Sequence, residues 1–224
     1  MKLQYVAGVV GALVLVSGAA QAAITLETTN FIASPTHFNG FEGFGASPDF
    51  DGTLYHQTSY TEDGISVAYV GSAPNQIWGG YTSWIGGEGN FGWYPNGGGT
   101  GYTQIKLAGG GDIGAIQFLA GSGWGEDTTL AYQLQKNGVV VASGVLNNPT
   151  NMHVLGFSGL GFDEVDLQSG QFSSFSGSNY EAFALDSVAV GGGGPVPEPT
   201  VWAIMIVGFG LTGAVLRRRI PVLA

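Results

Sequence analysis

Apolar and polar residues alternate in short stretches through the middle of the chain. The alternation is clear over 65–70 and again over 129–136. A period of two marks strands that bury one face. Asn137-Gly138 stands between 129–136 and 139–146, and Asn-Gly favours a tight hairpin turn because both turn positions need positive φ. The pattern therefore predicts a β-hairpin.

Other short stretches have the same strand-like composition and lie between Gly-rich turns. They cover residues 38–44, 102–107, 114–119, 153–157, 162–167 and 182–190. About nine such strands predict an all-β sandwich over 23–190. Glycine makes up 40 of the 224 residues, which disfavours helices because each interior glycine costs a helix about 1 kcal/mol. The Gly-rich residues 191–195 are expected to be a flexible linker.

The N-terminal segment has the three parts of an export signal. Lys2 supplies a positive charge, residues 6–16 are apolar, and Ala20-Gln21-Ala22 gives small residues at the two positions that signal peptidase reads. We therefore expect residues 1–22 to be a signal peptide, cleaved after Ala22, and the following domain to be exported across the inner membrane.

The C-terminal segment also has three parts. Residues 196–199 contain two prolines, which favour an extended backbone. Residues 201–216 carry no charge, and at about 1.5 Å per helical residue their length approaches a membrane core of about 30 Å. Arg217, Arg218 and Arg219 follow, and such a cluster stays on the cytoplasmic side. This pattern predicts one transmembrane helix.

The same segment resembles the PEP-CTERM sorting signal. The resemblance rests on Pro197-Glu198-Pro199, Trp202-Ala203, the Gly208-Phe209-Gly210 stretch and the arginine cluster, with 220–224 as an additional tail. It implies that an exosortase processes the chain near Pro197, Glu198 and Pro199 after transient anchoring in the inner membrane. It further implies a final location at the cell surface or in a biofilm matrix that contains exopolysaccharide.

Charge and cysteine content exclude several classes of protein. Residues 23–194 contain two lysines against 15 Asp and Glu residues, a net charge of −13. Such an acidic domain repels phosphate backbones, so nucleic acid is not an expected partner. The chain has no cysteine, which excludes disulfides, thiol nucleophiles and thiolate metal sites.

Two strand-like segments carry a second resemblance, to jelly-roll carbohydrate-binding modules. Residues 39–42 near the start and 184–190 at the end look like the first and last strands of such modules. The resemblance implies a jelly-roll-like sandwich in which Glu42 and Asp186 ligate a structural calcium ion. Family members often carry a second acid at the position of Ser187, and Glu42 and Asp186 can equally be ordinary strand-end carboxylates.

Aromatic residues gather in a Gly-rich region, 71–102. Exposed aromatic rings on such loops can stack against sugar rings, which makes Trp78, Trp84, Trp93 and Tyr94 candidate carbohydrate-binding residues. The alternative is that these rings cover the core of the sandwich, because Trp and Tyr are more often buried than exposed.

The remaining acids form no catalytic motif. They lie at 62–63, 88, 126–127, 163–164 and 166, and acids scattered at turns are usually solvated. We therefore expect no enzyme, but a secreted structural or adhesive protein of the cell surface or matrix. A carbohydrate-binding module that acts on exopolysaccharide, with or without calcium, is the alternative, and a glycoside hydrolase, which needs two suitably spaced carboxylates, comes third.

Overall fold

The computed structural model describes residues 24–46, 54–55, 58–72, 77–80, 85–95, 100–123, 126–170, 174–176 and 183–191. The predicted signal peptide, the sorting segment and the 220–224 tail lie outside these residues. Within the described ranges no helix is long and apolar enough to span a membrane.

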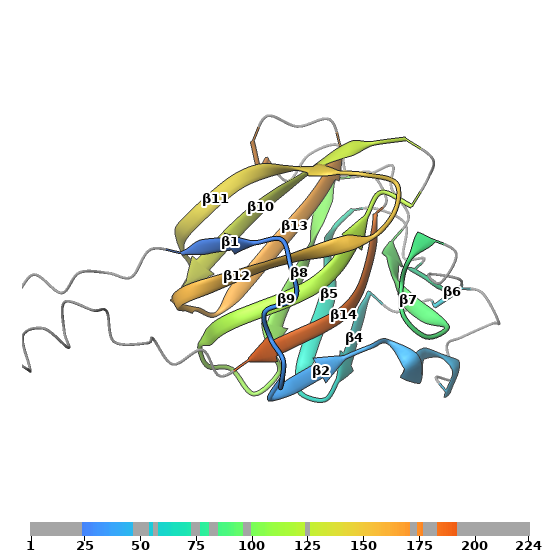
Figure 1. The fold of residues 1–224 in the computed structure, drawn as a ribbon, viewed down its shortest axis with the longest axis horizontal. Helices are drawn as coiled ribbons and strands as arrows, with labels where there is room; N and C mark the ends of the chain where they lie inside the picture. Colours follow the sequence, from blue (N-terminus) through green and yellow to red (C-terminus); the bar gives the residue numbers. More distant parts are fainter. Residues whose placement is uncertain are drawn as a thin grey trace, which may run out of the picture.

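The described chain folds into two antiparallel sheets, which lie one in front of the other in Figure 1. The six-stranded sheet has the order β11 (Val139–Asn148), β10 (Thr128–Lys136), β13 (Glu164–Gly170), β8 (Gly101–Leu107), β5 (Ile65–Gly71) and β4 (Ser59–Glu62).

The eight-stranded sheet has the order β1 (Thr25–Glu27), β12 (His153–Phe162), β9 (Ile113–Gly121), β14 (Ala184–Gly191), β7 (Phe91–Pro95), β6 (Ile77–Gly80) and β3 (Leu54–Tyr55), and β2 (His37–Asn39) also pairs with β14. The expected all-β sandwich is confirmed.

The core lies between the sheets because each strand turns one set of alternate side chains inward. In the six-stranded sheet, β13 contributes Val165 and Leu167, and β10 contributes Leu130 and Leu134. Phenylalanines from the other sheet, among them Phe118 and Phe157, meet them. The polar residues between these positions therefore point away from the core.

The Asn-Gly hairpin is confirmed. Asn137 and Gly138 have φ angles of 51° and 74°, and they connect β10 to β11. The pairing slips between Leu134 and Gln135, which leaves Val141 as the extra residue of a bulge. Asp163 fixes the turn from outside, since its Oδ2 accepts a hydrogen bond of 2.7 Å from the backbone N–H of Asn137.

Two expected strands have other boundaries. The strand expected over 38–44 ends at Asn39, and a short 3-10 helix, η1 (Glu42–Ala46), follows it. Phe41 has a φ of 60° and ends the extended backbone at this point. The strand expected over 162–167 is two strands, because β12 ends at Phe162 and β13 begins at Glu164.

Candidate functional site

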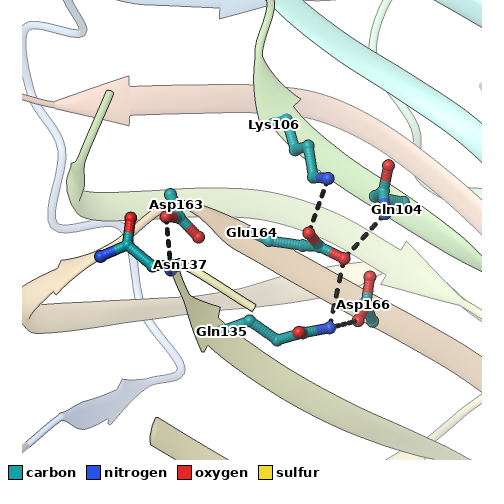
Figure 2. A network of polar contacts seen from close by, with 7 residues as sticks. All are labelled: Gln104, Lys106, Gln135, Asn137, Asp163, Glu164 and Asp166. Atoms are coloured by element: carbon teal, nitrogen blue, oxygen red, sulfur yellow. Dashed lines mark hydrogen bonds and ion pairs between the residues drawn. The ribbon is translucent and has the colours of Figure 1, made fainter. Parts of the chain in front are cut away.

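The outer face of the six-stranded sheet carries an ordered set of polar side chains. Alternation along β13 turns Val165 inward and its neighbours Glu164 and Asp166 outward. The sequence suggested that both acids are solvated at turns, but this is wrong. Both are buried, and both lie in a central strand of the sheet. Five residues, Gln104, Lys106, Gln135, Glu164 and Asp166, form what we call the polar network (Figure 2).

Glu164 is the hub of the polar network. Its Oε1 accepts hydrogen bonds from Gln104 Nε2 at 2.7 Å and from Gln135 Nε2 at 3.2 Å. Its Oε2 forms an ion pair of 2.6 Å with Lys106 Nζ. The hydrogen bond and charge of Glu164 raise the pKa of Lys106, so Lys106 keeps its positive charge. Three strands, β8, β10 and β13, thus place their side chains around one carboxylate.

Asp166 lies beside this hub and is only 1% exposed. Its Oδ2 accepts a hydrogen bond of 2.6 Å from Gln135 Nε2, whereas its Oδ1 is buried and has no partner within the described chain. Burial raises the pKa of Asp166 to about 7, and the nearby negative charge of Glu164 adds to this rise. Asp166 therefore exchanges its proton close to neutral pH.

The two buried carboxylates fix the orientation of two partly exposed amides. Gln104 and Gln135 are each held through Nε2, and no described residue donates a hydrogen bond to either Oε1. Both side chains are partly exposed, as is that of Lys106. The face thus presents two amides in fixed orientation together with an ammonium group, which supplies both donors and acceptors.

An aromatic pair lies on the same face. Tyr102 precedes Gln104 on β8, and its ring contacts that of Phe175 edge-on at a centroid distance of 5.4 Å. Burial raises the pKa of Tyr102, and the charges of Asp166 and Glu164 act in the same direction. The neighbouring Ser176 is attached to β13, because its backbone N–H donates to Gln168 Oε1 at 3.1 Å. A ring surface and polar groups are thus brought together.

The aromatic residues predicted to bind sugar have different surroundings. Trp93 is fully buried in the core, and its Nε1 donates to Thr103 Oγ1 at 3.0 Å, so the prediction of an exposed ring is wrong for this residue. Tyr94 is partly buried against a small cluster around Ile85 and Met152. Trp78 pairs through its backbone in β6, and its side chain and all of Trp84 lie outside the described part.

Glu42 and Asp186, the predicted calcium ligands, bind backbone amides of one segment, 88–91. Glu42 Oε1 accepts from the N–H groups of Asn90 at 2.7 Å and Phe91 at 3.2 Å. Asp186 Oδ2 accepts from the N–H of Glu88 at 2.8 Å.

Within the described residues no group of three or more His, Asp or Glu side chains is placed to hold a metal ion. Both carboxylates accept backbone hydrogen bonds as turn caps do, whereas a calcium site needs six to eight oxygens. Calcium binding by Glu42 and Asp186 stays a prediction of the sequence.

Sequence reasoning missed the polar network. The only signal is a polar period of two over 102–106, 133–135 and 164–168, and a single sequence does not say that these three strands are neighbours. The processing residues Ala20, Ala22, Pro197, Glu198, Pro199 and Arg217 to Arg219 all lie outside the described chain.

No protein-family model matches the chain, and no curated protein matches its sequence. Among solved structures, it is similar to a mutant family 29 carbohydrate-binding module complexed with mannohexaose, with 12% identity over 76% of this chain and 92% of that chain and a TM-score of 0.29. A second mutant of that module has 11% identity over 80% and 93% of the two chains and a TM-score of 0.30.

A third similar structure is the isomalto-dextranase of Arthrobacter globiformis T6 complexed with panose. It has 14% identity over 57% of this chain and 21% of that chain, with a TM-score of 0.26. These similarities are distant, and they assign no function to this chain.

Proposed function

We propose that the chain is a non-enzymatic carbohydrate-binding protein and that the outer face of its six-stranded sheet is the binding surface. The observation that carries this proposal is the polar network, in which the buried Glu164 and Asp166 orient the partly exposed amides of Gln104 and Gln135. A sugar presents many hydroxyl groups, each of which donates and accepts hydrogen bonds. Amides in fixed orientation can recognise such groups without first being ordered.

Burying Glu164 and Asp166 is not expected to stabilise the fold. Two buried carboxylates lose hydration, and their ion pairs and hydrogen bonds seldom do better than apolar residues of similar size. The outer face of a sheet tolerates small or β-branched residues, as β5 demonstrates with Ser66, Ala68 and Val70. A costly network that fixes polar groups at a surface is typical of a binding site.

Tyr102 completes the surface for a sugar ligand. Its ring is partly exposed and lies two residues from Gln104, hence on the same face of β8. The CH face of a pyranose ring packs on an aromatic ring while its hydroxyl groups reach neighbouring polar side chains. The local charges, two acids against Lys106, favour a neutral or cationic glycan over a polyuronate.

The placement of the two acids supports binding rather than hydrolysis. Glycosidases place two carboxyl groups on either side of the scissile bond. Here Glu164 and Asp166 are two residues apart on one strand and share the Nε2 of Gln135, so they lie side by side under the surface. The two carboxyl groups therefore leave no space between them for a glycosidic bond.

The site of action is proposed from the two ends of the sequence. Residues 1–22 would export the domain, and Pro197, Glu198 and Pro199 would direct exosortase processing. The glycan would then be a polysaccharide at the cell surface or in the surrounding matrix, and the protein would contribute to adhesion there.

A glycan array with the full-length chain tests the proposal, with Lys106→Ala and Lys136→Ala as matched variants. Both lysines form an ion pair, Lys106 with Glu164 inside the network and Lys136 with Asp112 outside it. We expect Lys106→Ala and Tyr102→Ala to weaken binding to the best glycan about ten-fold or more, a loss of about 1.4 kcal/mol. Lys136→Ala should bind as the wild type does.

Circular dichroism of each variant separates lost binding from lost folding. Failure of the wild type to bind any neutral or cationic glycan would refute the proposal. Equal effects of Lys106→Ala and Lys136→Ala on binding would move the site away from this face.

A further inference from the structure

Strand β11 forms an open edge of the six-stranded sheet. It pairs with β10 on one side, and no other described strand pairs with it (Figure 1). A sheet edge leaves alternate backbone N–H and C=O groups without partners in the sheet, which can pair with another strand. Its ten residues, Val139–Asn148, include no charged residue and no proline.

The start of this edge is apolar and accessible. Val139, Val140 and Val141 are 64%, 48% and 47% exposed. Valine has a high strand propensity, and three exposed valines in sequence add apolar surface to the free backbone. Natural proteins protect such an edge with lysine, proline, a bulge or a short strand length. β11 has the bulge at Val141 but no lysine and no proline, and it is ten residues long.

The other described sheet edges differ from β11. In the six-stranded sheet the opposite edge is β4, which has four residues and ends at Glu62. In the eight-stranded sheet one edge is β1, which has three residues and includes Glu27, and the other is β3, which has two residues. Among these edges, β11 is therefore the one suited to extend a sheet.

We propose that β11 pairs antiparallel with β11 of a second copy of the chain, so that two six-stranded sheets become one continuous sheet. Charge favours this occupant. The chain has a net charge of −10, so two copies repel one another over most of their surfaces. A two-fold interface places the same strand from each copy on both sides, so any charge on that strand is present twice and adds like-charge repulsion. The uncharged β11 avoids this repulsion.

The geometry of the pair has one further result. Two antiparallel strands of one sheet are related by a two-fold axis perpendicular to the sheet, so both outer faces point in the same direction. The two polar networks would lie on one surface of the dimer. Dimerisation through β11 needs no sugar ligand and is therefore independent of the proposed function.

Cysteine scanning of the full-length chain tests the proposal directly, because the natural sequence contains no cysteine. Single substitutions Val140→Cys, Ser143→Cys and Val145→Cys sample the outer side of β11, and Ser59→Cys and Thr61→Cys sample the edge strand β4 as controls. Opposed antiparallel residues have Cα separations of about 4.5–5.5 Å, which a disulfide can bridge.

We expect disulfide-linked dimers to accumulate at the β11 position nearest the two-fold axis, and at neither β4 position. Absence of dimers at all three β11 positions would overturn the proposal. So would equal cross-linking on β11 and β4, because this would indicate random collision.

Sedimentation velocity supplies a second measurement without any disulfide. The wild-type chain should sediment as a dimer, and Val141→Lys should raise the dimer Kd about ten-fold or more because it brings two positive charges into an otherwise uncharged, apolar interface. Thr61→Lys, on the opposite edge, should not change the Kd. A monomeric wild type at high micromolar concentration would also overturn the proposal.

Discussion

The indole Nε1 of Trp93 donates a hydrogen bond of 3.0 Å to Thr103 Oγ1 across the interior of the sandwich. Trp93 belongs to β7 of the eight-stranded sheet and Thr103 to β8 of the six-stranded sheet, so a polar contact joins the two layers inside the apolar core. Both side chains are fully buried. Trp93 therefore stabilises the fold and forms no part of a binding surface.

Trp93→Phe should destabilise the domain without affecting glycan binding. The substitution removes the donor to Thr103 and part of the ring volume, and we expect a loss of about 1–3 kcal/mol in the free energy of unfolding. Urea unfolding measures the loss. Tyr94→Phe is the control on the next residue and should cost less. A Trp93→Phe variant with native stability and no glycan binding would contradict this assignment.

Gly89→Ala should destabilise the domain more than Gly110→Ala, because the Glu42 carboxylate would have to move and give up its hydrogen bonds to the N–H groups of residues 90 and 91. Gly89 has a φ of 61°, and a Cβ there would collide with the carboxylate of Glu42. Gly110 has a φ of 72° and nothing within 4 Å of the position a Cβ would take, so Gly110→Ala carries only the backbone cost of a left-handed conformation, about 1–2 kcal/mol.

The difference between the two variants in thermal unfolding reports the clash with Glu42. In a Glu42→Ala background the carboxylate is absent, so Gly89→Ala and Gly110→Ala should lower the melting temperature by more similar amounts. Equal effects of Gly89→Ala and Gly110→Ala would show that Glu42 is not held against the 88–91 segment.

Asp166 should make the domain less stable as the pH rises from about 4 to about 7. Its pKa is raised from an ordinary 3.8 to about 7, so the folded chain binds this proton more tightly than the unfolded chain. The contribution to stability is complete below pH 4 and is lost between about pH 4 and pH 7, with an upper limit on the order of 4 kcal/mol.

The measurement is the free energy of unfolding at several pH values for the wild type and Asp166→Asn. Asn resembles the protonated acid and removes the titration, so the wild type should lose stability relative to the variant as the pH rises. Asp112→Asn, at an exposed acid, is the control. A constant difference between wild type and Asp166→Asn from pH 5 to pH 8 would contradict the raised pKa.

Calcium distinguishes metal ligands from turn caps at Glu42 and Asp186. As caps of the 88–91 segment, these carboxylates should give calcium no advantage over magnesium at matched ionic strength. A ligand specific to the folded state at 100 times its Kd would add about 2.7 kcal/mol. A melting temperature raised by calcium alone, and no longer raised in Asp186→Asn, would instead establish the calcium site implied by the sequence resemblance.

Glu198→Ala tests the proposed sorting of the chain. If an exosortase reads Pro197-Glu198-Pro199, the variant should remain unprocessed in the membrane fraction of a host with that protease. Immunoblots of cell fractions follow the two forms. Release of Glu198→Ala at the wild-type rate would remove the basis for the sorting assignment.

Local signals predicted the local structure. Asn137-Gly138 gave the hairpin correctly because a turn with two positive φ angles depends on only those two residues. The bulge at Val141 could not be predicted, since it depends on how β11 packs along β10. The end of a strand at Asn39 was also missed, because Phe41 has a high strand propensity and yet takes a positive φ, with its N–H donating to Asn39 Oδ1.

The candidate site depends on contacts between distant parts of the sequence. Gln104 reaches Glu164 only because β8 lies beside β13, and nothing in the residues of either strand specifies that neighbour. For the same reason Glu164 and Asp166 resembled solvated surface acids. For Trp93 the error was the reverse: a residue predicted to be exposed is buried. Composition alone does not tell whether its ring faces solvent or the core.

Strand β14 also decides when this fold can form. It is the last described strand of the chain, yet it lies between β9 on one side and β7 and β2 on the other, inside the eight-stranded sheet. A ribosome or a translocation channel releases the chain from its N-terminus, so β9 and β2 emerge long before the strand that joins them. Until Ala184–Gly191 is free, the eight-stranded sheet has a gap at its centre. The eight-stranded sheet can therefore be completed only after β14 has emerged.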